Sequence, residues 1–251
     1  MWLNNEQLKA SAIGSYRASL KRACPKHIVI DGLFNPSKLD EVAEVLQQPS
    51  AWQTQKHTYA ALYVDNAQWQ KANNEQRFVQ RDVWQRDAMD SNATNATNAT
   101  NATNATNATN ANSLHSSIAK EFLSYLRGDE FMSVLSRIFN VSLTDMNVAD
   151  PDINTNYFRL GANDFVAEHA DDSPGREVCM LLYLNKDWNK DAGGELVFIG
   201  KNAEPVHIAP LYNRCVLFDP CTEGSEHWVK SISSEYADKY RYNVTSWYWS
   251  E

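Results

Sequence analysis

The C-terminal half of the chain consists of short runs in which apolar and polar residues alternate. From Val141 onward these runs are separated by Gly, Pro, Asn and Asp, at spacings typical of the strands of a sandwich or barrel. The runs that we interpret as strands are residues 155–160, 164–169, 176–184, 194–199, 204–209, 213–219, 227–232 and 240–249. With helices covering one side, they predict an α+β protein built on a double-stranded β-helix, the jelly-roll or cupin-like barrel.

The region before these strands supplies helices and further strands. Residues 27–34 predict a strand and a turn, and the next residues predict a helix with Asn35 as its cap and Pro36 at its first position. The apolar stripe of this helix consists of Leu39, Val42, Ala43 and Leu46. Further strands are expected at 58–65 and 77–84, and further helices at 113–128 and 130–139.

The domain organisation follows from these patterns. We predict a single domain over residues 1–251, with an N-terminal strand and helices over about 26–140 and a β-helix core over about 141–250. Residues 92–112 are a repeat of Asn, Ala and Thr without any apolar residue larger than Ala. Because such a segment cannot bury enough surface to offset the entropy of ordering, we expect a flexible low-complexity insertion there.

The composition excludes some partners. The net charge of −8 argues against nucleic acid or an anionic membrane as the main partner, because both require a basic surface. No segment approaches the roughly 20 apolar residues needed to cross a bilayer, and the N-terminus lacks an uninterrupted apolar core, so a cytoplasmic protein is expected. The four cysteines form no C-x-x-C pair and are expected to be reduced.

Two polar residues stand out in the predicted strand 164–169 and its continuation. His169 and Asp171 are two positions apart, and residues two apart in a strand share a face, so an imidazole and a carboxylate point to the same place. Asp172 lies on the opposite face and is expected to be a solvated turn residue. His169 and Asp171 would make half a metal site, and a third ligand must come from elsewhere.

Two further histidines lie in the β region. His207 has no other unusual residue near it and fits an ordinary strand or surface histidine. His227 begins a strand and precedes the last one. One face of that last strand carries Arg241, Asn243, Thr245 and Trp247. Because an arginine is costly to bury unless it meets an anion, this row indicates an anion site near His227.

These residue types together indicate one kind of chemistry. Two histidines and one carboxylate on one side of a metal, with the other positions open, are typical of non-haem Fe(II) oxygenases. Such an iron can take a bidentate co-substrate and still bind dioxygen. Because a guanidinium pairs with a carboxylate through two charge-assisted hydrogen bonds, we interpret 2-oxoglutarate as the anion beside Arg241.

The order of these residues resembles the prolyl-hydroxylase-like branch of the 2-oxoglutarate/Fe(II) oxygenases. The segments that carry the resemblance are EHADD, GR, LLYLNKDWNKDAGGEL, NRCVLFD, SEHWV and RYNVTSWYW, which span nearly the whole C-terminal half. They are similar to the hypoxia-factor and ribosomal-protein prolyl hydroxylases. The H-x-D pair alone is weakly specific, whereas the ordered series of Tyr-Leu-Asn, Trp, Gly-Gly, distal His, Arg and Trp is strongly specific.

The resemblance implies roles for individual residues. The residues that it assigns to Fe(II) are His169, Asp171 and His227. Arg241 would pair with the far carboxylate of 2-oxoglutarate, and Tyr183 matches the tyrosine that hydrogen-bonds the same co-substrate. Thr245 and Trp247 match positions that line its pocket. Between His227 and Arg241 this chain is longer than the hypoxia-factor enzymes, with SSEYADK as the extra loop.

Three residues are candidates for contact with substrate. The family often places a tyrosine shortly before the proximal histidine, where this chain has Tyr157 and Arg159. Tyr157 also fits a core aromatic, and Arg159 fits a surface or ion-paired group. Arg176 matches a family arginine near the mouth of the site, although a turn arginine is usually solvated. Residues 68–84 are interpreted as part of the substrate entrance.

The implied reaction is hydroxylation of an unactivated C–H bond with Fe(II), 2-oxoglutarate and O2, and with ascorbate as an auxiliary reductant. The resemblance favours a prolyl residue in a protein or peptide, and a free amino acid or small metabolite is the alternative, because fold-level analogy does not separate them. Two other classes stay open. A cupin-type metal isomerase, or a dioxygenase without co-substrate, would need no Arg241. In a non-catalytic binding module the three candidate ligands would be ordinary polar residues.

Overall fold

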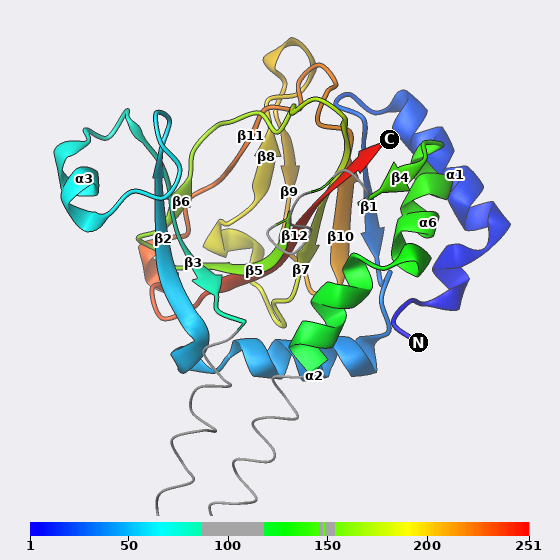
Figure 1. The fold of residues 1–251 in the computed structure, drawn as a ribbon, viewed down its shortest axis with the longest axis horizontal. Helices are drawn as coiled ribbons and strands as arrows, with labels where there is room; N and C mark the ends of the chain where they lie inside the picture. Colours follow the sequence, from blue (N-terminus) through cyan, green and yellow to red (C-terminus); the bar gives the residue numbers. More distant parts are fainter. Residues whose placement is uncertain (87–117, 146–147, 149–153, 251) are drawn as a thin grey trace, which may run out of the picture.

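Two facing antiparallel sheets form the centre of the protein. The computed structural model describes residues 1–86, 118–145, 148 and 154–250, and the predicted insertion at 92–112 lies outside them. The larger sheet has the order β1-β10-β7-β12-β5-β3-β2, and the smaller sheet has the order β11-β8-β9 (Figure 1). This is the predicted α+β double-stranded β-helix with supporting helices.

The strands occupy the following residues. Those of the larger sheet are β1 (His27–Asp31), β10 (Arg214–Phe218), β7 (Arg176–Tyr183), β12 (Arg241–Ser250), β5 (Thr155–Leu160), β3 (Arg77–Trp84) and β2 (Trp52–Thr58). Two short strands join it: β4 (Leu143–Thr144) pairs with β12, and β6 (Phe165–Val166) pairs with β3. Those of the smaller sheet are β11 (His227–Val229), β8 (Leu196–Phe198) and β9 (Val206–Ile208).

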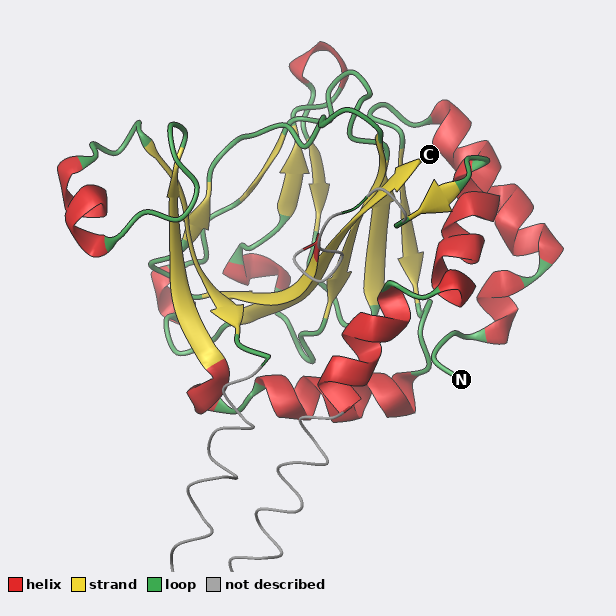
Figure 2. Ribbon diagram, viewed as in Figure 1, coloured by secondary structure: helices red, strands yellow, loops and turns green. Residues whose placement is uncertain are grey.

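The helices gather on one side of the larger sheet (Figure 2). They are α1 (Ala10–Arg22), α2 (Pro36–Leu46), the helical residues 118–126 and α6 (Asp129–Phe139). Helix α3 (Asn66–Lys71) lies apart from them, in the connection between β2 and β3. Single 3-10 turns are Asn5–Leu8, Pro49–Ala51, Lys190–Ala192, Lys201–Ala203 and Ser234–Tyr236. No helix among these described segments is long and apolar enough to cross a membrane.

Helix α2 forms where the sequence predicts it. The Asn35 side chain accepts a hydrogen bond from the backbone N–H of Ser37 at 3.0 Å, and Pro36 occupies the first helical position. This arrangement satisfies one of the free N–H groups at the start of a helix, while proline has no N–H to satisfy. The whole predicted apolar stripe is buried, so the helix is held against the larger sheet by the hydrophobic effect.

Strand β7 joins the two cores of the protein. Its even-numbered side chains from 178 to 182 pack on the helix side, and its odd-numbered side chains from 179 to 183 pack between the two sheets. A strand buried on both faces is apolar throughout, as the sequence of β7 is. The space between the sheets is therefore lined by alternate residues of each strand, and it is this inner face that carries the functional residues.

The predicted strand at 58–65 is wrong. Strand β2 ends at Thr58, and the chain turns at once, with the Ala61 N–H donating to the Thr58 carbonyl at 3.2 Å. Tyr63 has a φ of 57°, which no strand allows. The apolar side chains that suggested a strand, those of Tyr59, Leu62 and Tyr63, are 57%, 65% and 70% exposed. They lie at the tip of the β2–β3 hairpin instead of in a core.

The sequence pattern also does not predict α1. Of its 13 residues only Ile13 and Leu20 are buried, so its apolar face is too short to stand out.

Candidate metal centre and co-substrate pocket

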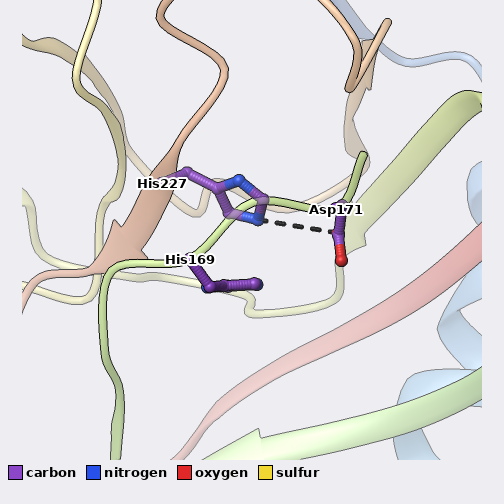
Figure 3. A group of neighbouring side chains, drawn as sticks. All are labelled: His169, Asp171 and His227. Atoms are coloured by element: carbon purple, nitrogen blue, oxygen red, sulfur yellow. Dashed lines mark ion pairs between the residues drawn. The ribbon is translucent and has the colours of Figure 1, made fainter. Parts of the chain in front are cut away.

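His169, Asp171 and His227 converge in the structure (Figure 3). One ligand atom from each lies within 4.8 Å of the others. His169 and Asp171 lie on the loop after β6, and His227 is the first residue of β11. The two histidines form an isolated antiparallel bridge, with N–H to carbonyl distances of 3.0 Å and 2.9 Å. This bridge connects the larger sheet to the smaller one and sets the two imidazoles side by side.

The local structure around His169 differs from the predicted strand. Strand β6 ends at Val166, and Asp171 lies in a loop. No continuous strand with alternating faces is formed there: the bridge to His227 holds His169, and contacts from Trp247 and Arg176 hold Asp171. Asp172 is exposed, as a solvated turn residue is expected to be.

Both histidines present the same ring nitrogen to the site. Nδ1 of His169 is 2.9 Å from the Ala167 carbonyl, and Nδ1 of His227 is 2.9 Å from the Ser225 carbonyl. A carbonyl only accepts, so Nδ1 carries the proton and Nε2 keeps a free lone pair. Burial, together with the neighbouring His169, lowers the pKa of His227 to about 4. At neutral pH the His227 imidazole is thus uncharged and able to bind a metal.

The carboxylate of Asp171 is held by three donors. Trp247 Nε1 donates to Oδ2 at 2.9 Å, and the Cys179 thiol lies 3.7 Å from the same oxygen. Arg176 Nη1 donates to Oδ1 at 3.2 Å and to the Asp171 backbone carbonyl at 2.7 Å. Burial raises the pKa of Asp171, but the two histidines, Trp247 and Arg176 outweigh it, so the pKa is lowered overall. The group is therefore an ionised, oriented ligand.

This donor set fits Fe(II). It offers two neutral imidazole nitrogens and one carboxylate oxygen from a single side, which is the ligand type and number of the 2-His-1-carboxylate triad. The separation of the ligand atoms is one that bonds of roughly 2.0–2.2 Å can span after a small movement of side chains.

Arg241 is buried on the inner face that also carries Trp247, the donor to Asp171. Its side chain is on β12, and the residue is 1% exposed. Nε donates to the Gly194 carbonyl at 2.7 Å, and Nη1 donates to Asn243 Oδ1 at 2.7 Å. Nη2 is buried and has no hydrogen-bond partner among the described residues, and the same holds for the Tyr183 hydroxyl. The Arg241 guanidinium carbon lies 4.8 Å from the centre of the Tyr183 ring.

A buried cation with one unpaired N–H group fits an anionic ligand. Burial lowers the pKa of Arg241, which means that the charged form lacks the solvation that a carboxylate would replace. The far carboxylate of 2-oxoglutarate would satisfy both Nη2 of Arg241 and the Tyr183 hydroxyl. The residues present thus fit this co-substrate.

The absence of a side chain at Gly194 leaves room for the side chain of Arg241. The φ of Gly194 is 76°, and a Cβ at this position would lie 3.2 Å from Cδ of Arg241. A larger residue would therefore strain the backbone and push the arginine away from the carbonyl that positions it.

Thr245 and Trp247 share the inner face with Arg241, and their place in the lining of the co-substrate pocket stays a prediction. The Thr245 hydroxyl accepts from Asn243 Nδ2 at 2.9 Å, so it supports Arg241 through Asn243. Trp247 donates to the candidate metal ligand Asp171. Trp247 is thus in direct contact with the metal centre.

Two of the three candidate substrate residues, Tyr157 and Arg159, do not face the metal centre, whereas Arg176 contacts the candidate ligand Asp171. Tyr157 lies on the helix side of β5, where its hydroxyl donates to the Ala119 carbonyl at 2.9 Å, so it is a core aromatic. Arg159, on the same side, pairs with Asp82 at 2.9 Å. Arg176 orients Asp171. The sequence offers residues of the right type near His169, but strand parity places Tyr157 and Arg159 behind the sheet.

The sequence analysis does not identify Arg81, which does face the site. Arg81 is on β3, within the segment 68–84 that was interpreted as a substrate entrance. It shares strand parity with Val79 and Val83, two apolar residues of an inner face, and an arginine in such a row is the signal that could have revealed it.

The comparisons with known proteins agree with this geometry. The model of the 2OG-Fe(II) oxygenase superfamily matches residues 155–249. The chain is 29% identical over 132 residues to the prolyl 3-hydroxylase OGFOD1 of Xenopus laevis, which covers 50% of this chain and 24% of the relative. It is 26% identical over 133 residues to the Mus musculus protein of that name, covering 51% of this chain and 23% of the relative.

Solved structures share the fold. A prolyl-4-hydroxylase of Pseudomonas putida matches with a TM-score of 0.57 and 13% identity, covering 95% of this chain and 99% of that chain. A prolyl hydroxylase of Trichoplax adhaerens, solved with a peptide of the hypoxia inducible factor, matches with a TM-score of 0.54 and 18% identity, covering 96% and 94%. Residues 155–249 of this chain thus match the 2OG-Fe(II) oxygenase superfamily model, and prolyl hydroxylases are among the proteins to which the chain is similar in sequence and in fold.

Proposed function

We propose that this protein is a 2-oxoglutarate-dependent dioxygenase that hydroxylates a prolyl residue of a protein or peptide. The observation that carries the proposal is the convergence of His169, Asp171 and His227 beside Arg241, a buried cation with an unpaired N–H group. A cupin isomerase has no use for such an arginine, and a binding module has no use for three oriented metal donors.

Three groups of residues would have different roles: binding Fe(II), binding 2-oxoglutarate and orienting the metal ligands. His169, Asp171 and His227 would hold Fe(II), and Arg241 and Tyr183 would hold the far carboxylate of 2-oxoglutarate. When bound, these groups supply the oxidising chemistry that converts O2, 2-oxoglutarate and a C–H bond into an alcohol, succinate and CO2. Trp247 and Arg176 fix the orientation of Asp171, and the two backbone carbonyls fix the histidine tautomers.

The prolyl substrate is supported by the curated relatives and by the solved prolyl hydroxylases. The matched region spans about a quarter of the length of those curated relatives, so their activity is an inference for this chain.

The proposed activity can be tested with the purified protein. With Fe(II), ascorbate and 2-oxoglutarate it should release succinate, slowly without substrate, and mass spectrometry of treated lysate should find an added oxygen on prolyl residues. His169→Ala should lower succinate release by more than the roughly 10- to 100-fold typical of changes to groups that only support a ligand. Asp172→Ala is the matched control, because this neighbouring carboxylate is exposed.

Two outcomes would contradict the proposal. Absence of both succinate release and metal-dependent 2-oxoglutarate binding would rule out the dioxygenase. Added oxygen on free amino acids or small metabolites, and none on prolyl residues, would leave the dioxygenase standing and make the prolyl substrate wrong.

A further inference from the structure

We propose that Arg81, together with Gln55 and His57, forms a carboxylate-binding subsite at the mouth of the metal centre. It would anchor an acidic group of the substrate beside the C–H bond that is hydroxylated. This inference rests on the proposed function and names the chemistry of its substrate. The carboxylate has two possible sources, an Asp or Glu side chain in a peptide and the α-carboxylate of a free amino acid.

The strand register places Arg81 on the inner face. Val83 pairs directly with Phe158, and Phe158 pairs directly with Asn243, which hydrogen-bonds Arg241. Directly paired residues of antiparallel strands have their side chains on one face, and residues two apart in a strand do as well. Arg81 therefore faces the same space as Arg241.

The Arg81 side chain is anchored at its stem and free at its end. Nε donates to Gln55 Oε1 at 3.3 Å, and the guanidinium carbon lies 3.6 Å from the centre of the Phe158 ring. Within the described part of the chain, the two terminal nitrogens have no hydrogen-bond or ion-pair partner. Burial lowers the pKa of Arg81 to about 10, and the charge of Asp171 opposes this shift, so Asp171 and Arg81 are electrostatic neighbours.

His57 adds a second unpaired polar group to this face. It is 7% exposed, its Nε2 has no hydrogen-bond partner among the described residues, and it pairs with Val79, next to Arg81 on the inner row. Its ring contacts Tyr63 and Phe78, and the Phe78 ring lies 5.0 Å from that of His169. Burial and the charge of Arg81 lower the pKa of His57 to about 4, so a neutral imidazole stands beside the guanidinium.

This combination favours an anion from outside the chain. The buried Nε2 of His57 has no partner among the described residues, which costs free energy, and the cost is recovered when a ligand satisfies it. The charge of Arg241 is a further, smaller cause of the lowered pKa of Arg81, so this face holds two cations that anionic ligands would offset. Arg241 is closed off, whereas Arg81 is half-buried, and Gln55 and Tyr63 line an adjoining cavity of about 500 Å³. The open position of Arg81 favours the substrate over the co-substrate.

The experiment compares wild type, Arg81→Gln, Arg81→Glu and the control Arg159→Gln, an arginine on the opposite side of the sheet. First, 2-oxoglutarate is titrated calorimetrically into the Mn(II)-loaded proteins without O2. Arg81→Gln should bind it within about twofold of wild type, because Arg241 still holds the far carboxylate. This step also shows that each variant is folded.

Second, each Fe(II)-loaded protein is given free amino acids and a library of capped peptides with random residues around a central proline. Wild type should add oxygen to peptides with Asp or Glu at one fixed position, or to free amino acids if the α-carboxylate is the anchor. Arg81→Gln should lose this preference, and the affinity of the Mn(II)–2-oxoglutarate complex for the preferred compound should fall by about 10- to 100-fold. Arg81→Glu should select Lys or Arg at that position.

The possible outcomes distinguish failure of the proposed dioxygenase function from failure of the Arg81 subsite. Wild type that neither binds 2-oxoglutarate nor oxidises any compound contradicts the proposed function itself. The carboxylate subsite is overturned if Arg81→Gln loses 2-oxoglutarate affinity, since Arg81 would then serve the co-substrate. It is also overturned if Arg81→Gln keeps the acidic preference, if wild type has none, or if wild type binds 2-oxoglutarate but oxidises neither the peptides nor the amino acids.

Discussion

Arg241 and Arg81 lie on the same inner face of the larger sheet, yet the protein surrounds them differently. Arg241 is 1% exposed, and backbone and amide oxygens accept from two of its three nitrogens, so that among the described residues only Nη2, with its two N–H bonds, is left without a partner. Within the described ranges, Arg81 is held through Nε and the Phe158 ring, at a half-buried position. This difference fits two kinds of ligand. The buried Arg241 would bind 2-oxoglutarate, which is the same in every reaction, and the half-buried Arg81 would bind a substrate in which the residues around the carboxylate differ.

The largest expected effect is that of Arg241→Ala on the closed pocket. Affinity for 2-oxoglutarate should fall by about 100-fold or more, since removing one partner of a buried charge pair costs about 3–5 kcal/mol. Calorimetric titration of the Mn(II)-loaded protein measures this, with metal binding measured separately. Arg159→Gln, at an ion pair with Asp82 on the opposite side of the sheet, is the control. Equal loss of metal binding would show that Arg241 supports the metal centre, and the contrast with Arg81 would then fail.

A smaller effect is expected from Tyr183→Phe. The ring that packs against Arg241 is kept, and only the unpartnered hydroxyl is removed. Affinity for 2-oxoglutarate should fall by about 10-fold, as for one hydrogen bond to a charged group. The same titration measures it, with Tyr157→Phe on the helix side as the control. An unchanged affinity would mean that the pocket recognises its anion through Arg241 alone.

The smallest effect concerns the pH dependence of the open subsite. The pKa of His57 falls from 6.5 to about 4 on folding, so between these values the unfolded chain binds more protons and the folded state loses stability as pH falls. From pH 7 to pH 6 this residue should contribute a loss of roughly 0.7 kcal/mol. Urea unfolding of the metal-free protein measures it, and His57→Gln should remove that part of the slope. An identical slope in both proteins would show that His57 is not buried as described.

Much of the fold follows from local patterns that the sequence displays directly. The strands β5 to β12 fall on the eight predicted runs, with β12 extending one residue past its run, because each run alternates with the period of a strand and ends at a turn residue. Helix α2 carries its own cap and stripe. The failure at 58–65 has a physical cause: its tyrosines and leucine look like a buried face, but the hairpin turns there and leaves them exposed.

In the candidate site, too, local sequence patterns predict one part and tertiary structure decides the other. By itself, the sequence determined the residue types and their order: the H-x-D pair, the distal histidine and the row from Arg241 to Trp247 on one strand face. Tertiary structure decided how they meet. The His169–His227 bridge, the donors to Asp171 from Arg176 and Trp247, and the approach of Arg81 to the site all join residues far apart in the chain or on separate elements. Such contacts depend on strand pairing and sheet closure, and no local periodicity encodes the partner of a strand.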